Sequence, residues 1–315
     1  MTKVRRYFLW QRQGRSLRAV LSVFLTALSA VNRLKNTKIK IRNSGERKKT
    51  MKNTKIIAVA NQKGGVGKTT TTINVGAALA LMGKKVLLID LDTQESMSNF
   101  FGVYNAENNI GKALYKTVNR EGIDLADYIV TNEVNGIDMI PAELNTMQRI
   151  AIDLVSVRSK ETVFRRLINQ NSELLDRYDY ILLDCPPSLN VILDNALTAS
   201  RYVLIPCQAH PLSYPPLPNL LLQIDEIQAE LNESIEVIGI VPTMVDRSTN
   251  SRQTVDMLRE NYADVVFETE VERMAVAANS ALTEKAVVLS NAKDNRVSRE
   301  YKELANELVN RIEGV

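Results

Sequence analysis

One loop constrains this chain more than any other feature. Residues 61–72 read NQKGGVGKTTTT, and Gly67-Lys68-Thr69 ends the loop as in the phosphate-binding pattern G-x-x-x-x-G-K-[ST], although Gln62 stands where that pattern has its first glycine. The apolar run at 56–60 predicts a buried strand before the loop, and apolar residues at helical spacing over 69–82 predict a helix after it. A strand, a phosphate loop and a helix in this order indicate an α/β fold.

The residues of the loop predict a nucleotide-binding site. Glycines allow the backbone to turn tightly, so that successive N–H groups face phosphate oxygens, and the following helix adds the partial positive charge of its N-terminus. Lys68 is expected to place its ammonium near the β- and γ-phosphates, and Thr69 to offer its hydroxyl to Mg²⁺. The predicted nucleotide-binding residues of the loop are Gln62, Lys63, Gly64, Gly65, Val66, Gly67, Lys68, Thr69 and Thr70.

Lys63 is a second lysine in the same loop, five positions before Lys68. Since one lysine already serves the phosphates of its own chain, the second can project away from them and reach phosphates bound by another subunit, as an arginine finger does in trans. The alternative is a solvated surface lysine. Spacing alone leaves both open.

Apolar runs that alternate with helical patterns predict the rest of the fold. Strands are expected at 85–90, 136–140, 180–184, 202–206 and 236–241, and helices at 161–175, 216–231 and 250–260. Buried strands separated by helices predict an α/β, doubly wound and mostly parallel sheet with helices on both faces. In such sheets ligands bind beyond the carboxyl ends of the strands, where the loop, Asp90, Asp92 and Asp184 all fall.

Three aspartates are candidates for metal and water chemistry at that edge. Asp184 ends an apolar strand before Cys185-Pro186-Pro187, which is typical of a Walker B carboxylate that holds Mg²⁺ directly or through water; a helix cap is the alternative. Asp90 and Asp92 lie two residues apart, so on an extended chain they face opposite ways and only one is expected to face the γ-phosphate. The predicted metal residues are Thr69, Asp90 and Asp184.

The charge of the chain divides into two unlike parts. Residues 1–50 hold 14 Lys and Arg against the single acid Glu46, a net charge of +13, whereas residues 51–315 hold 26 basic and 35 acidic residues, a net charge of −9. We therefore predict a basic N-terminal extension at 1–50 and one catalytic domain at 51–315. Three interpretations of the extension stay open: translation that begins at Met51, a functional basic arm, or a targeting segment.

Composition argues against several other classes. Two cysteines do not make a disulfide scaffold and indicate a reducing compartment, and a single histidine, His210, removes most zinc and Ser-His-Asp sites. The sequence has no uncharged apolar run of about 18 residues, so no ordinary membrane span is expected.

The loop resembles the deviant Walker A motif xKGGxGK[ST] of the ParA/MinD family of ATPases, and residues 90–94, DLDTQ, resemble the family's DxDPQ switch. The similarity extends over roughly residues 54–312 and implies the P-loop NTPase fold, with ATP and Mg²⁺ as cofactors. It also implies an ATP-dependent homodimer in which Lys63 crosses to the partner subunit's nucleotide and Asp92 orients the attacking water, with Asp90 supporting the metal site. The predicted catalytic residues are Lys63, Lys68 and Asp92.

The same resemblance assigns a segment beside the adenine and marks three departures. Residues 241–246, VPTMVD, look like the adenine segment, which adds Pro242, Thr243 and Met244 to the nucleotide-binding residues. Thr93 stands where the family usually has proline, and Glu95-Ser96-Met97 where Gly-Asn-Ala is common, so a different loop rigidity and turnover rate are expected. Val276 replaces the second arginine of a family DNA-contact stretch, whereas Arg273 matches the first.

These features predict a DNA-partition ATPase of the Soj/ParA type, cytoplasmic and nucleoid-associated, with no membrane partner. It would dimerise with ATP, bind DNA without sequence preference, and hydrolyse ATP weakly until a ParB-like centromere-binding protein stimulates it. Because the catalytic domain is acidic overall, DNA contact requires a local basic patch. The candidates are Arg247, Arg252, Arg273, Lys293, Arg296 and Arg299.

Other members of the superfamily remain alternatives. A MinD-like membrane-cycling ATPase needs a cationic amphipathic C-terminal helix, but residues 299–313 are net acidic. A bacterial tyrosine kinase would carry a C-terminal tyrosine cluster, and an iron–sulfur reductase would carry cysteines placed to share a cluster between subunits. A regulator of cell-surface polymer synthesis and a nucleotide-dependent scaffold that does not hydrolyse ATP also remain.

Overall fold

The computed structural model describes residues 53–273, 284–290 and 295–314. These residues form one seven-stranded sheet in the order β3-β4-β2-β5-β1-β6-β7, in which only the edge pair β3 and β4 is antiparallel. The strands are β1 (Lys55–Val59), β2 (Val86–Asp90), β3 (Val130–Asn132), β4 (Ile137–Ile140), β5 (Tyr180–Asp184), β6 (Tyr202–Gln208) and β7 (Glu236–Thr243). The predicted doubly wound, mostly parallel sheet is confirmed.

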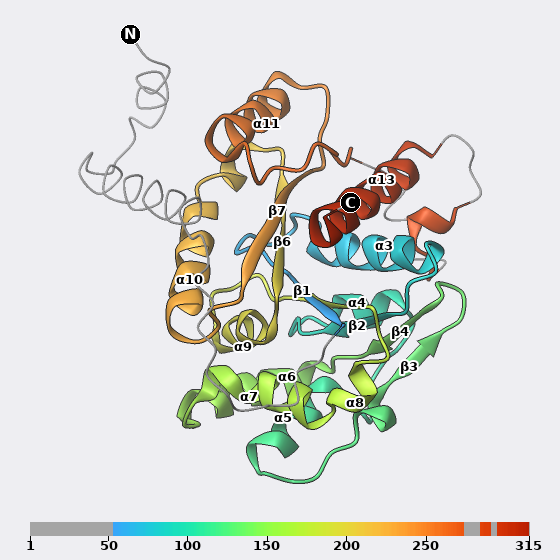
Figure 1. Ribbon diagram of the computed structural model, residues 1–315, viewed down its shortest axis with the longest axis vertical. Helices are drawn as coiled ribbons and strands as arrows, with labels where there is room; N and C mark the ends of the chain where they lie inside the picture. Colours follow the sequence, from blue (N-terminus) through green and yellow to red (C-terminus); the bar gives the residue numbers. More distant parts are fainter. Residues whose placement is uncertain (1–52, 274–283, 291–294, 315) are drawn as a thin grey trace.

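Helices cover both faces of this sheet (Figure 1). One face packs against α3 (Lys68–Leu81), α4 (Ser96–Phe100), the short helix η5 (Val287–Leu289) and α13 (Arg296–Glu313). The other packs against α5 (Ile110–Val118), α6 (Leu144–Asp153), α7 (Val163–Gln170), α8 (Ser172–Leu175), α9 (Val191–Ala199), α10 (Leu217–Glu230) and α11 (Thr249–Tyr262). Short 3-10 turns lie at η1 (Leu125–Tyr128), η2 (Leu154–Ser156), η3 (Lys160–Thr162) and η4 (Pro211–Ser213).

The central strands are apolar throughout because both of their faces are buried. In β1, Ile56 and Ala58 enter the core under α9 and α10, while Ile57 and Val59 enter the core under α3 and α13. Successive side chains of a strand point to opposite faces, so an uninterrupted apolar run is what two packed faces require. Burial of both faces fixes the register that brings the strand ends together.

The strand order places a crevice at the carboxyl end of β1. From β1 the chain passes through α3 to β2, which lies beyond β5, whereas β6 lies on the opposite side of β1. A reversal of direction of this kind leaves room for a ligand beyond the strand ends. The pairing of Val59 with Asp184 and of Asp90 with Asp184 aligns the predicted site residues at this edge.

Several predicted elements differ from the observed ones. Strand β6 continues two residues past the predicted end at Pro206, and α11 continues two residues past the predicted end at Glu260. The helix expected over 161–175 is divided into η3, α7 and α8, with a break at Asn171. The side chain of Asn171 accepts a hydrogen bond from the Leu125 N–H and donates one to the Leu167 carbonyl, so a contact with a distant loop stabilises the break. Strand β7 continues two residues past the predicted end at Val241, and therefore Pro242 and Thr243 lie in the sheet.

Candidate active site

The phosphate loop ends in a helix N-terminus that is open to a ligand. Gly65 and Gly67 have φ values of +71° and +89°, which L side chains rarely adopt, and α3 begins directly after them at Lys68. No side chain among the described residues caps this helix. Its first N–H groups and its positive dipole end therefore face the crevice, as an anion site requires.

Lys68 is buried at this N-terminus. It is 6% exposed, and its ammonium donates a long hydrogen bond, 3.4 Å, to the Lys63 carbonyl. Burial lowers the pKa of Lys68, and the nearby carboxylates of Asp184 and Asp92 oppose this shift. The site thus holds a largely buried cation in the field of two nearby carboxylates.

Asp184 has a free oxygen beside the loop. The carboxylate is fully buried, and Oδ1 accepts a hydrogen bond of 3.5 Å from the Thr72 hydroxyl. Among the described residues, Oδ2 has no hydrogen-bond partner. Burial, and then the nearby Asp90, raise the pKa of Asp184, while a hydrogen bond from the Thr69 side chain lowers it. A buried carboxylate oxygen without a partner is costly unless a cation or a proton balances it.

Asp90 and Asp92 differ in what they contact. Asp90 is fully buried; its Oδ1 accepts from the Asp92 N–H at 3.1 Å, and its Oδ2 accepts from the N–H and the hydroxyl of Ser98 at 2.9 and 2.7 Å. Burial raises the pKa of Asp90 to about 6. Both oxygens of Asp90 thus hold the loop that follows β2. The sequence did not identify the contact with Ser98.

Asp92 lies in the turn after β2 and is 7% exposed. Its Oδ1 accepts a hydrogen bond of 3.0 Å from the Gln94 N–H. Burial raises the pKa of Asp92, and the charge of Lys68 acts in the opposite direction. The structure therefore brings Asp92, Lys68 and Asp184 together at the carboxyl edge of the sheet.

Lys63 turns away from the phosphate loop and toward the end of β6. Its ammonium donates hydrogen bonds to Gln208 Oε1 at 3.1 Å and to Ser213 Oγ at 2.7 Å. Burial lowers the pKa of Lys63. Neither Gln208 nor Ser213 could be found from sequence, because each lies about 150 residues along the chain from Lys63. The neighbouring Gln62 has a buried Oε1 that accepts no hydrogen bond from a described residue.

A cavity of about 350 Å³ adjoins the loop on the side of β7. Thr243 donates to the Val66 carbonyl at 2.8 Å, which joins the end of β7 to the loop, and Met244 follows with a left-handed φ of +51°. The predicted residues Gly67, Thr70, Thr243 and Met244 line the cavity, whereas Pro242 is buried within β7. Sequence reasoning missed the opposite wall, formed by Val271, Glu272, Arg273, Val287, Val297 and Tyr301.

The DNA-contact candidates separate into two groups. Arg252 pairs with Glu270, Arg273 with Asp246, and Arg296 with Glu272 and Glu300. Arg247 and Arg299 are exposed and have no ion pair within the described part of the chain. Lys293 and Val276 lie outside the described residues.

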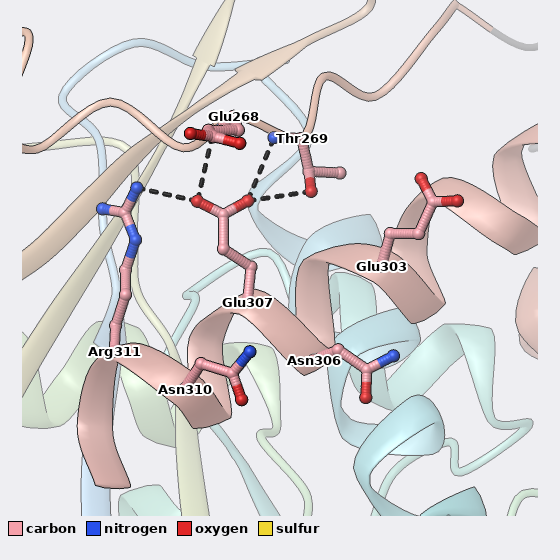
Figure 2. Close-up of a pocket in the computed structure, with 7 residues that line it drawn as sticks. All are labelled: Glu268, Thr269, Glu303, Asn306, Glu307, Asn310 and Arg311. Atoms are coloured by element: carbon pink, nitrogen blue, oxygen red, sulfur yellow. Dashed lines mark hydrogen bonds and ion pairs between the residues drawn. The ribbon is translucent and has the colours of Figure 1, made fainter. Parts of the chain in front are cut away.

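A second hollow, of about 590 Å³, lies on the outer side of α13, away from the phosphate loop. In Figure 2, Glu307 occupies its centre and accepts hydrogen bonds from the N–H groups of Glu268 and Thr269, from the Thr269 hydroxyl and from Arg311. Arg311 also stacks on the Phe267 ring, 3.9 Å from its centroid. These contacts attach the segment after α11 to α13, so the residues around this hollow stabilise the packing of the C-terminal helix.

Comparison with known proteins gives consistent matches over most of the chain. The family described as "AAA domain" matches residues 54–237. The sporulation initiation inhibitor protein Soj of Bacillus subtilis is 35% identical over 255 residues, which are 81% of this chain and 98% of that protein. The chromosome partitioning protein ParA of Caulobacter vibrioides is 35% identical over 261 residues, which are 82% of this chain and 94% of that protein.

A solved structure agrees with the fold. Cobyrinic acid a,c-diamide synthase from Mycobacterium smegmatis, with bound ADP and magnesium, has a TM-score of 0.69 and 26% sequence identity, over 82% of this chain and 96% of that chain. The match therefore includes the sheet and the helices that carry the loop.

Proposed function

The chain belongs to the Soj/ParA family of ATPases, and from that premise we propose that it is a DNA-partition ATPase. It binds ATP with Mg²⁺, forms a dimer, binds DNA without sequence preference, and hydrolyses ATP when a ParB-like centromere-binding protein stimulates it. One observation carries the proposal: a helix N-terminus and an aspartate oxygen, both without a side-chain partner among the described residues, meet a buried lysine at the switch point of the sheet.

The residues at the edge of the sheet fit a magnesium nucleotide. Mg²⁺ takes oxygen ligands and is commonly held by one or two carboxylates, with phosphates and water completing its shell. Asp184 Oδ2 and the Thr69 hydroxyl are the groups that would hold it. Within the described residues, no three His, Cys, Asp or Glu side chains converge to hold a metal on their own, so nucleotide phosphates would complete this site. The related synthase structure contains ADP and magnesium.

Asp92 is the candidate for the hydrolytic step. Its position next to Lys68 and its attachment to the turn through Gln94 support a role in orienting the attacking water. Asp90 supports the site less directly, because its two oxygens hold the loop and its charge contributes to the raised pKa of Asp184. Lys68 would neutralise charge on the transferred phosphoryl group.

Lys63 is the candidate for a contact in trans. In the single chain its ammonium rests on Gln208 and Ser213, so in a dimer it must leave these partners to reach the other subunit's nucleotide. Mixing Lys63→Ala with Asp92→Ala subunits tests this. A mixed dimer has one site with an intact Asp92 and a lysine supplied by the partner subunit, and phosphate release should partly recover. Mixed dimers that form without recovery would count against the role in trans.

Non-specific DNA binding would use exposed arginines that form no ion pair with a described residue. Arg247 and Arg299 are its strongest candidates because their charges are not neutralised within the described residues. Phosphate contacts by Lys and Arg dominate such binding and make it depend on salt. Replacing either arginine should weaken DNA retention equally for all sequences and lower its salt dependence.

The structure disfavours the MinD-like alternative. The apolar face of α13, with Tyr301, Leu304, Leu308 and Val309, is buried in the core against α3 and η5. A membrane-binding helix needs this face free. Separately, no helix in the described part of the chain is both long and apolar enough to cross a membrane.

The experiment that tests the function compares nucleotide states. The purified protein is passed over duplex DNA of unrelated sequence with MgATP, with MgADP and without nucleotide, and phosphate release is measured in parallel. Retention that requires MgATP, is prolonged in Asp92→Ala and is lost in Lys68→Ala is expected. ATP hydrolysis without ATP-dependent retention would refute partition while leaving the ATPase assignment intact.

A further inference from the structure

The turn that carries Asp92 is fixed to the N-terminus of α6. Glu95, three residues after Asp92, accepts a hydrogen bond through Oε2 from the N–H of Leu144, the first residue of α6, at 3.0 Å. We propose that Glu95 is a positioning residue that holds the turn and thereby orients Asp92 for hydrolysis. The inference rests on the proposed function, since it assumes that Asp92 acts on the attacking water.

The backbone at Glu95 is in an unfavourable conformation. Its φ and ψ are 47° and 34°, the left-handed region that favours glycine. Such a conformation persists in another residue when the surroundings determine it. Three hydrogen bonds do so: the Glu95 N–H donates to the Asp92 carbonyl at 3.0 Å, its carbonyl accepts from Asn99 at 2.9 Å, and its carboxylate accepts from Leu144.

Among the residues that the structure describes, Glu95 is the one acceptor for an N–H group at the N-terminus of α6. Glu143 caps the helix itself, with Oε1 accepting from the Asn145 N–H and Oε2 from the Thr146 N–H. The remaining N–H of the first turn, that of Leu144, donates to Glu95. A carboxylate at a helix N-terminus is favoured by the helix dipole as well as by the hydrogen bond. The α6 terminus therefore draws the Glu95 side chain to a fixed position.

A second tie runs parallel to the first. The Ser98 hydroxyl accepts from the Ala142 N–H at 2.9 Å and donates to Asp90 Oδ2 at 2.7 Å. Glu95 and Ser98 thus connect the loop after β2 at two points to the segment 142–144. Ser98 fixes Asp90, and Glu95 fixes the turn in which Asp92 accepts from Gln94. Of the two ties, only that of Glu95 acts directly on the turn of Asp92.

The consequence is kinetic. Nucleotide affinity would come from the loop amides, Lys68 and the metal. The hydrogen bonds of Glu95 to described residues go to Asp92, Asn99 and Leu144, not to the phosphate loop, whereas the angle of the Asp92 carboxylate depends on the turn. A displacement of about 1 Å in such a group can cost roughly a hundredfold in rate. Loss of Glu95 should therefore lower kcat and leave the affinity for MgATP unchanged.

Four proteins test the inference: wild type, Glu95→Ala, Glu95→Gln and Glu143→Ala. Glu95→Ala removes the acceptor and should lower kcat roughly tenfold to a hundredfold, with the Kd for a fluorescent ATP analogue within about twofold of wild type. Glu95→Gln keeps an acceptor oxygen and should recover most of the rate. Glu143→Ala removes the other carboxylate at the same terminus; it should lower Tm but leave kcat within about twofold.

Two further results decide between interpretations. Hydrogen exchange of the segment 142–147 should be faster in Glu95→Ala than in wild type, which reports the tie whether or not the protein hydrolyses ATP. Equal loss of kcat in Glu143→Ala and Glu95→Ala, or a parallel loss of nucleotide affinity, would overturn the positioning role. Absence of hydrolysis in the wild type, with faster exchange in the variant, would overturn the hydrolytic role given to Asp92 and leave the tie itself in place.

Discussion

The resting contacts of Lys63 make a prediction about dimerisation. If the lysine must leave Ser213 and Gln208 to reach another subunit, then weakening these contacts should favour the dimer. Ser213→Ala removes the shorter of the two hydrogen bonds, 2.7 Å, and keeps the contact with Gln208. The side chain of Ser213 is fully buried, and alanine fills almost the same volume.

The size of the effect follows from the kind of bond removed. A hydrogen bond from a charged donor contributes about 1.5–3 kcal/mol when protected from water. Lys63 is partly exposed, so water replaces part of this and about 1 kcal/mol remains. Since about 1.4 kcal/mol corresponds to tenfold, the change is about fivefold for each lysine. A symmetric dimer contains two, so its association constant should rise by up to about twenty-five-fold.

Sedimentation velocity over a range of protein concentrations, with a slowly hydrolysed ATP analogue and Mg²⁺, measures this constant. Ser156→Ala is the matched control, because Ser156 is exposed and bonds only within its own turn, to the Asp153 carbonyl. Lys63→Ala should remain monomeric while still binding nucleotide. If Ser213→Ala folds with an unchanged Tm yet dimerises no better than wild type, Ser213 is not a resting partner of Lys63.

Three further predictions concern hydrolysis and stability. Asp92→Ala should slow phosphate release at least about tenfold while MgATP binding, measured by calorimetry, is retained; loss of binding would show that Asp92 belongs to the nucleotide site. Glu307→Gln should lower the free energy of unfolding by about 1–3 kcal/mol near neutral pH. Burial raises the pKa of Glu307, but its hydrogen bonds outweigh burial and leave the pKa below the ordinary value of 4.5. The contribution of the Glu307 carboxylate to stability is therefore present above pH 4.5 and is lost as the pH falls through the lowered pKa. From about pH 5 to about pH 3, Tm should fall less in Glu307→Gln than in wild type. Gly239→Ala should cost about 1–3 kcal/mol, measured by urea unfolding, because a Cβ there would overlap the Phe267 ring; an unchanged midpoint would contradict this packing.

The parallel strands were the most predictable elements, because burial of both faces requires an uninterrupted apolar run whatever the neighbouring residues are. The strand expected at 180–184 is observed with the same bounds, and that at 85–90 begins one residue later. Each is an apolar run that ends in a polar residue at the sheet edge, where solvent or ligand begins. The requirement that both faces be buried is visible in the sequence itself.

Helices were less predictable wherever a distant residue determines their ends. The break at Asn171 depends on the Leu125 N–H, 46 residues away, and the first turn of α6 depends on Glu95, 49 residues away. Neither partner has a local pattern that marks it. Short helices such as α4 and α5 also carry too few residues for periodicity to distinguish them from loops.

In the candidate site, too, the residues that are contiguous in the sequence could be predicted and their partners from other elements could not. A phosphate loop is readable because its chemistry needs adjacent backbone N–H groups, so glycines, lysine and threonine must be contiguous. The groups that hold these residues come from other elements: Gln208 at the end of β6 and Ser213 in η4 hold Lys63, and Ser98 in α4 holds Asp90. Serine and glutamine are common residue types, so no local pattern marks these three.

Tyr301 is the clearest case of a site residue without a sequence signal. It lies in α13, is 3% exposed, and its hydroxyl is 3.5 Å from the Thr71 hydroxyl in the first turn of α3. It also lines the cavity beside Thr243 and Met244. The sequence of this helix shows only an amphipathic pattern, which indicates that one face is buried but not which element covers it. Only the fold, by packing α13 on α3, makes this helix a wall of the cavity beside the phosphate loop, so a change in its packing has a direct route to that loop.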